Sequence, residues 1–222
     1  MKMGVLFSGG KDSTLAALLA KKAGHSISCL ITMYSENPDS YMFHTPSIKK
    51  TEKQAEAMGI PLIIQETKGV KEQELVDLEL AVKKAVKQYE IKGLVTGAVQ
   101  SVYQASRIQK ICDNLGLECF NPLWQKDQIE LLHDLLNEKF RVVVTGVSAY
   151  PLNGSWLGRE IDKQFIEEMK ILNAKYKISP AGEGGEFESF VLECPLFKQP
   201  LKVTGANFSG EENSWKMELE LK

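Results

Sequence analysis

The feature of this chain that most constrains its fold is a short apolar run that ends in a glycine-rich loop near the N-terminus. Met3–Phe7 is apolar enough to form a buried strand, and it continues directly into Ser8-Gly9-Gly10-Lys11-Asp12-Ser13. The residues that follow, 11–23, carry leucines at helical spacing and stop at Gly24. A strand that passes through glycines into a helix is typical of α/β proteins.

A loop of this composition is suited to hold phosphate groups. Glycines let the backbone approach a phosphate, hydroxyls and N–H groups donate to it, and the positive end of the helix dipole faces it. Lys11 adds a positive charge, and Asp12 either suits a Mg²⁺ ion that bridges phosphates or simply caps the helix. Neither the kinase-type phosphate loop nor the dinucleotide fingerprint can be drawn through residues 8–13. We therefore predict an anion-binding loop of another type, in preference to a tight capped turn alone.

Strands and helices alternate along the first half of the chain. Apolar runs at 27–33, 62–64 and 94–96 predict strands. The segments between and after these strands predict helices, one from Thr45-Pro46 to Gly59, one over 70–89 and one over 100–115. This order predicts an α/β fold with a doubly wound parallel sheet and helices on both faces.

The pattern changes after Asn121-Pro122. A helix around 129–136 and a strand at 142–147 continue the alternation briefly, and a further helix ends near 175. The last part predicts antiparallel strands at 187–192, 201–208 and 215–221. We expect a first domain of residues 1–125 and a smaller α+β C-terminal domain of residues 126–222.

Composition excludes several classes of function. The chain has 27 Lys+Arg and 29 Asp+Glu, a net charge of -2, which argues against tight, sequence-independent binding of nucleic acid. No apolar run approaches the roughly 18 residues that a membrane span needs. The four cysteines are scattered, so neither a zinc site nor a disulfide framework is expected, and buried thiols in a cytoplasmic protein are the simplest interpretation.

The loop S-G-G-x-D-S after the first strand resembles the PP-loop of the ATP pyrophosphatases, which split ATP between its α and β phosphates and share a HUP-like fold. Further segments narrow the resemblance to the diphthine–ammonia ligase family, and it extends to about Pro195. These segments are Thr32–His44, Gly97–Arg107, Asn121–Trp124, Trp156–Arg159 and Gly182–Ser189.

The resemblance implies an AMP-forming carbon–nitrogen ligase. ATP, with Mg²⁺, would adenylate the carboxylate of diphthine on elongation factor 2 with loss of pyrophosphate, and ammonia would then displace AMP to give diphthamide. The chain offers no glutaminase nucleophile, with Lys2 at the second position, so free ammonium is the expected nitrogen source. On this interpretation, residues 1–125 bind ATP and residues 126–222 recognise the substrate.

ATP-binding residues should gather where the strands of the parallel sheet end, because ligands bind outside the carboxyl ends of such strands. Met33 and Tyr34 could flank the adenine there, or could be ordinary strand-end packing. Gly97 follows a strand at the same edge. The full expected ATP-binding set is Ser8, Gly9, Gly10, Lys11, Asp12, Ser13, Met33, Tyr34 and Gly97.

Catalytic side chains are expected in the phosphate loop and in the helix after Gly97. Gln100, Gln104 and Arg107 are spaced i, i+4, i+7 and so share one helix face, which is either functional or merely solvated. An arginine fork suits phosphate or carboxylate. The expected catalytic set is Lys11, Asp12, Gln104 and Arg107, with Asp12 as the Mg²⁺ ligand.

Substrate-binding residues are expected in the distal acidic loop and in nearby aromatic positions. Diphthine carries a fixed quaternary ammonium, which carboxylates and an aromatic face complement. Exposed glycine-acid turns and a lone loop histidine are the structural alternatives. The expected set is His44, Tyr103, Trp124, Glu183, Glu186 and Glu188.

Two other functions stay open at this level. A tRNA-modifying ligase would share the loop and the fold, and a non-catalytic nucleotide sensor would share the loop without turnover. The oligomeric state, a homo-oligomer included, is not determined by the sequence.

Overall fold

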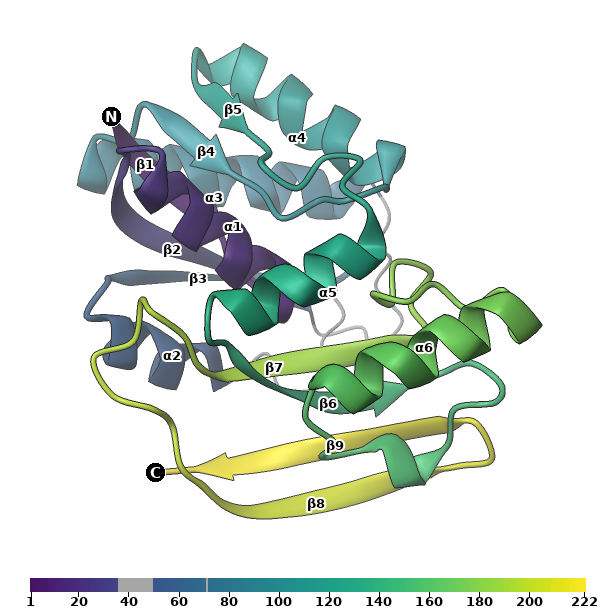
Figure 1. The fold of residues 1–222 in the computed structure, drawn as a ribbon. Coiled ribbons are helices and arrows are strands. Elements are labelled where there is room, and N and C mark those ends of the chain that lie inside the picture. The colour runs from purple at the N-terminus through teal and green to yellow at the C-terminus, as the bar shows by residue number, and fades with distance from the viewer. Residues whose placement is uncertain (36–49, 71) are drawn as a thin grey trace.

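Two β-sheets joined by helices make up the chain in the computed structural model, which describes residues 1–35, 50–70 and 72–222 (Figure 1). The strands are β1 Lys2–Leu6, β2 Ser26–Ser35, β3 Leu62–Thr67, β4 Gly93–Val95, β5 Glu118–Phe120, β6 Arg141–Val147, β7 Phe187–Glu193, β8 Val203–Glu211 and β9 Ser214–Leu221. The helices are α1 Lys11–Lys22, α2 Thr51–Met58, α3 Gln73–Tyr89, α4 Val102–Leu115, α5 Gln128–Asn137 and α6 Lys163–Tyr176, with a short 3₁₀ helix, η2, at Gly154–Trp156.

The first sheet is five-stranded and parallel, with the order β3-β2-β1-β4-β5. Successive side chains of a strand point to opposite faces, so Leu30 of β2 joins the core under α1 and α5, while Cys29 and Ile31 join the core under α3 and α4. The predicted doubly wound sheet is confirmed. Strand β5 was not predicted, because its three residues carry too little pattern to be recognised.

Glycines end helices α2 and α4 as expected. Gly59 and Gly116 take left-handed backbone angles, φ 67° and φ 63°, at the ends of α2 and α4. The predicted start of α4 at Gln100 is wrong, because Ser101 is the N-cap and its side chain accepts a hydrogen bond from Gln104 N. Gln100 therefore precedes the helix, and the expected i, i+4, i+7 face that includes it does not form.

The second sheet is four-stranded and antiparallel, with the order β7-β6-β9-β8. The predicted strand at 142–147 is confirmed as β6, between helices α5 and α6, but it pairs antiparallel with β7 and β9 and so belongs to the second sheet. Strand β6 is buried on both faces, so its sequence lacks the alternation of apolar and polar residues. Buried parallel strands lack the same alternation, so the sequence does not distinguish the two kinds of strand.

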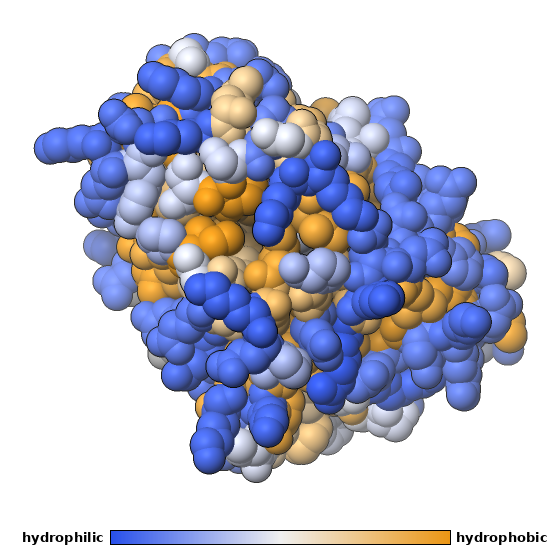
Figure 2. Space-filling model, turned by 60° about the vertical axis from the view of Figure 1, so that its left-hand side comes forward, coloured by the Kyte–Doolittle hydropathy of each residue, from blue (hydrophilic) through white to orange (hydrophobic). Residues whose placement is uncertain are grey.

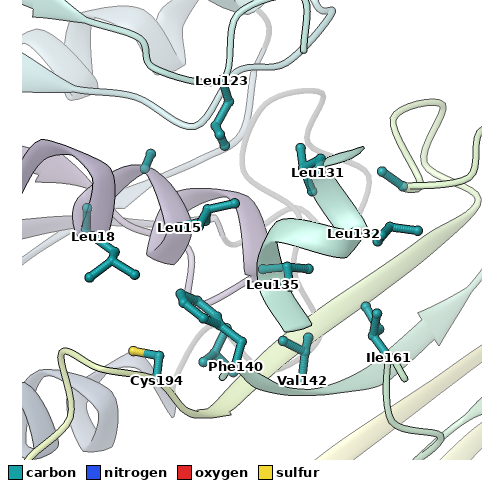
Figure 3. Close-up of a cluster of buried hydrophobic side chains, with 14 of the residues drawn as sticks. Leu15, Leu18, Leu123, Leu131, Leu132, Leu135, Phe140, Val142, Ile161 and Cys194 are labelled. Carbon is teal, nitrogen blue, oxygen red and sulfur yellow. The ribbon is translucent and has the colours of Figure 1, made fainter. Parts of the chain in front are cut away.

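One apolar cluster joins the two halves of the chain. Leu15 and Leu18 of α1 meet Leu131 and Leu135 of α5, and Phe140 lies beside them (Figure 3). Residues on both sides of the expected boundary at 125 thus share one core. On the face drawn in Figure 2, hydrophilic residues make up most of the projecting surface and apolar residues gather in a hollow between them. No helix in the described ranges is long and apolar enough to cross a membrane.

Candidate active site

The strand order of the first sheet reverses at β1, since β2 and β3 extend the sheet to one side and β4 and β5 to the other. The loops that leave β1 and β4 therefore diverge at this point, which is where open α/β sheets bind ligands. A cavity of about 580 Å³ lies here. It is lined by four segments: the phosphate loop with the end of β1, the end of β2, the β4–α4 connection with α4, and the stretch 182–185 and 187–189 that leads into β7.

The phosphate loop, residues Ser8–Ser13, is held by its own hydroxyl groups. Gly10 N donates to Ser8 Oγ at 3.4 Å, and Ser13 Oγ donates to Gly10 O at 3.2 Å. The two hydroxyl oxygens, of Ser8 and Ser13, lie 3.2 Å apart. Gly9 has φ 80°, a left-handed angle that favours glycine. Both hydroxyl-bearing residues line the cavity, so they are placed to donate to an anion there.

Lys11 and Asp12 form an ion pair at the start of α1. Lys11 is 4% exposed, and its Nζ lies 2.8 Å from Asp12 Oδ2 and 5.4 Å from the ring centroid of Phe187. The other oxygen, Asp12 Oδ1, is buried and has no hydrogen-bond partner in the described part of the chain. A buried carboxylate oxygen without a donor fits a cation or an N–H group supplied by a ligand.

Gly97 allows the β4–α4 connection to lie against the start of α1. A Cβ at this position would come within 2.8 Å of Asp12 C and of Ser13 N. Since these are backbone atoms, any larger residue would push the two loops apart. The structure thus places Gly97 on the cavity wall beside the phosphate loop, as the sequence predicted.

The expected residues of α4 separate from one another. Gln104 lines the cavity. Arg107 turns away: its Nη2 lies 2.6 Å from Glu72 Oε1, and its guanidinium stacks on the Tyr103 ring at 3.4 Å. The Tyr103 hydroxyl also donates to Glu72, at 3.1 Å. Arg107 and Tyr103 are not among the residues that line the cavity.

Of the two β2 residues expected at the ATP site, only one lines the cavity. Met33 lines the cavity together with Ile31 and Ile108, which gives it an apolar wall. Tyr34 is half-buried and is not part of the lining. His44 lies outside the described residues.

The three glutamates of the distal acidic loop have different surroundings. Burial, followed by the negative charge of Asp12, raises the pKa of Glu183 to about 7. Burial also raises the pKa of Glu188 to about 8, against the opposing charge of Lys216. Both residues line the cavity. Their carboxyls are thus held where a bound cation would stabilise the ionised form.

Glu186 holds the acidic loop in shape instead of lining the cavity. Its two carboxylate oxygens accept hydrogen bonds from Ser179 N and Gly184 N, each at 2.8 Å. Trp124 is 36% exposed and does not line the cavity either.

Gln54 and Ser189 contact the phosphate loop and were not predicted. Gln54 Nε2 donates to Gly9 O at 2.9 Å, and Lys11 N donates to Ser189 Oγ at 3.3 Å. The available signal for Gln54 was its place on the apolar face of α2, with Thr51, Ala55 and Met58 at helical spacing. A polar residue in such a stripe marks a buried hydrogen bond.

Comparison with known proteins assigns the family. The profile of the diphthamide synthase N-terminal domain matches residues 1–119, and that of the diphthamide synthase C-terminal domain matches residues 127–220. The chain belongs to the diphthamide synthase family. The match covers both the sheet that carries the phosphate loop and the sheet that carries the acidic loop, so the cavity lies between two parts of one family architecture.

Curated relatives are similar over most of this chain. A diphthine–ammonia ligase of Bos taurus is 32% identical over 91% of this chain and 83% of its own length. One of Schizosaccharomyces pombe is 31% identical over 92% of this chain, which spans only 36% of that relative. A solved structure described as a predicted subunit of tRNA methyltransferase from Methanocaldococcus jannaschii is 21% identical, with a TM-score of 0.45, over 88% of this chain and 98% of that one.

Proposed function

We propose that this chain is an AMP-forming ligase that converts diphthine on elongation factor 2 to diphthamide with ATP and ammonium. The observation that carries the proposal is that the phosphate loop and the acidic loop border one cavity at the strand switch point. The enzyme class predicted from the sequence, a diphthine–ammonia ligase, is confirmed by the family profiles and the relatives. Residues 1–125 would chiefly bind ATP, and residues 126–222 would recognise the protein substrate in the cytoplasm.

The reaction has two steps that balance without a further reactant. A carboxylate oxygen of diphthine attacks the α phosphorus of ATP, and the bond from that phosphorus to the departing pyrophosphate oxygen breaks. Ammonia then attacks the acyl carbon, the bond to the AMP oxygen breaks, and the nitrogen loses a proton. Positioning and neutralisation of phosphate charge are the main contributions a protein makes to such steps.

The phosphate loop would hold the β and γ phosphates. Ser8 and Ser13 supply hydroxyl donors, the start of α1 supplies N–H groups, and Lys11 supplies a buried positive charge. The apolar wall of Ile31, Met33 and Ile108 suits the adenine, with Gly97 close to the start of α1. Gln104 reaches the same cavity and could contact the reacting carboxylate.

Asp12 fits the magnesium site expected from the sequence. Its Oδ1 has no hydrogen-bond partner in the described structure, and Mg²⁺ is commonly held by one carboxylate together with substrate phosphates. No group of three or more His, Cys, Asp or Glu residues that could hold a metal occurs among the described residues. Any ion bound here would therefore depend on the phosphates of ATP, whose charge it would neutralise.

Glu183 and Glu188 would receive the quaternary ammonium of diphthine, since both carboxylic residues line the cavity. Burial raises the pKa of both carboxyls in the free protein, and a bound cation would lower the pKa of each by stabilising the charged form. Arg107, Tyr103, Trp124 and Glu186 are not among the residues that line the cavity, and the roles expected for them from the sequence stay predictions.

The proposal is tested with ATP, Mg²⁺, ammonium and diphthine-bearing elongation factor 2. AMP and pyrophosphate should appear in equal amounts, and the mass of the factor should change as its carboxylate becomes an amide. Lys11→Met should lower kcat by about 100-fold or more, because one charge-stabilising donor is commonly worth that much. Lys110→Met, an exposed lysine of α4, is the matched control and should leave kcat unchanged.

Two outcomes contradict the proposal. Formation of ADP and phosphate would place the cleavage at the wrong phosphate. Formation of AMP with no change in the mass of elongation factor 2 would show that another carboxylate is the substrate.

A further inference from the structure

The phosphate loop is attached on its outer side to a strand of the other sheet. Strand β7 is an edge strand of the antiparallel sheet, and its free edge faces the loop. Val191 N donates to Gly9 O at 3.1 Å, and Ser189 Oγ accepts from Lys11 N at 3.3 Å. Gly9 and Lys11, on either side of Gly10, are thus fixed by a strand about 180 residues away in sequence.

Gln54 of α2 bridges the phosphate loop and strand β7. Its side chain is fully buried, and its Nε2 donates to Gly9 O at 2.9 Å and to Val191 O at 2.8 Å. Both N–H groups of one amide are therefore used, one on the loop and one on the strand. A side-chain amide nitrogen carries two donors, which is the requirement for bridging two carbonyl oxygens.

The space around Gly9 is closed by the same side chain. A Cβ on Gly9 would come within 2.3 Å of Gln54 Oε1 and 3.2 Å of Thr51 Cγ2. The left-handed backbone of Gly9 and the side chain of Gln54 thus fit together as a pair. Neither could be replaced by a larger residue without a shift of the loop.

Anchoring Gly9 O fixes the direction of the next N–H group. The peptide between Gly9 and Gly10 is planar and trans, so its C=O and N–H point in opposite directions. With the oxygen held toward β7 and Gln54, Gly10 N is aimed into the loop, where Ser8 Oγ accepts from it at 3.4 Å. Gly10 and Ser8 both line the cavity, so this N–H is available to a phosphate that displaces the weak internal bond.

We propose that Gln54 is a positioning residue for ATP, which ties the phosphate loop to the edge of the C-terminal sheet and sets the direction of the Gly10 N–H group. The inference rests on the proposed function, since it assigns the loop to the phosphates of ATP. It adds that both sheets, and not the first alone, determine the geometry of nucleotide binding.

The test uses Gln54→Met, which keeps the length and much of the volume of the side chain but removes both donors. ATP binding, measured by calorimetry on the full chain with Mg²⁺ and without the protein substrate, should weaken about tenfold or more, because misplacement of a binding group by about 1 Å can cost up to 100-fold. The KM for ATP should rise more than kcat falls. Amide hydrogen exchange of a peptide spanning residues 8–14 should become faster.

Val82→Ala is the matched control, since Val82 is fully buried in the core under α3, away from the loop. This variant should lose stability and bind ATP as the unaltered chain does. If Val82→Ala weakened ATP binding as much as Gln54→Met, the effect would follow from lost stability and the inference would be overturned.

Ser189→Ala is the second variant, for use if Gln54→Met does not fold. It removes only the acceptor for Lys11 N, and it should weaken ATP binding severalfold. The inference would be overturned if a folded Gln54→Met variant showed unchanged ATP affinity and unchanged amide hydrogen exchange. If only Ser189→Ala folds, the same two results in that variant would overturn it. If the unaltered chain binds ATP but makes no diphthamide, the proposed function is overturned. The ATP affinities of the variants and the unaltered chain can still be compared, so the role of Gln54 is tested separately.

Discussion

At the scale of the residue, Glu188 shows how burial in a site affects stability. Its pKa rises from an ordinary 4.5 to about 8 because the carboxyl is withdrawn from water, although Lys216 on β9 opposes the shift. The folded state therefore holds a proton that the unfolded state releases at lower pH. The stability that this proton provides is fully present below pH 4.5 and is lost as the pH rises through 8.

Glu188→Gln should therefore be more stable than the unaltered chain above pH 8 and about equally stable near pH 5. The amide mimics the neutral carboxyl at every pH, so the difference in thermal midpoint should grow across this range. Glu193→Gln, an exposed position on the same strand, is the control and should show a flat difference. A difference of the opposite sign above pH 8 would show that Glu188 is charged and stabilised in the free protein.

At the scale of the element, Gly97 determines how closely the β4–α4 connection approaches α1. Gly97→Ala would place a Cβ 2.8 Å from two backbone atoms of the phosphate loop, so the elements must separate. We expect a loss of about 1–3 kcal/mol in the free energy of unfolding, typical of overpacking, and weaker ATP binding. Urea unfolding and calorimetry with ATP measure the two effects.

The control for this change is Gly116→Ala at the end of α4. Gly116 has φ 63° and nothing within 4 Å of its Cβ position, so this variant carries only the conformational cost of about 1–2 kcal/mol. It should leave ATP binding intact. Equal ATP affinity in the two variants would mean that the approach of the loops is not what shapes the site.

At the scale of the whole molecule, the two sheets should unfold together. In the described part of the chain, the largest apolar cluster joins residues of α1, α5 and β6 (Figure 3) with residues of β7. The phosphate loop is also hydrogen-bonded directly to β7. Since neither half can lose this core alone, calorimetry should show a single transition with calorimetric and van't Hoff enthalpies that agree. Two separated transitions would show instead that residues 1–125 and 126–222 are stable independently.

The local features of this protein follow from residues that are neighbours in the sequence. A strand, a glycine-rich loop and a helix follow one another at residues 3–23, and this order predicted both the parallel sheet and the place of the phosphate loop. The helix ends at Gly59 and Gly116 were also predicted, because the capping of a helix depends on residues that are neighbours in the sequence. The sequence motifs also predicted the ligase class, because a family motif is a set of residue types at fixed positions and can be recognised without the structure.

Which of these residues come into contact depends on how the helices and sheets pack. Arg107 and Gln104 are three positions apart on α4, yet Arg107 pairs with Glu72 while Gln104 reaches the cavity. Gln54 and Ser189 contact the phosphate loop from α2 and β7. The place of Gln54 on an apolar helix face indicates a buried hydrogen bond, but it does not indicate the partner. Helical periodicity shows which residues share one face of a helix, but it does not show what that face packs against. A hydrogen bond between distant segments depends on how the sheets pack. For this reason the position of the loop was predictable, whereas the residues of α2 and β7 that hold it from outside were not.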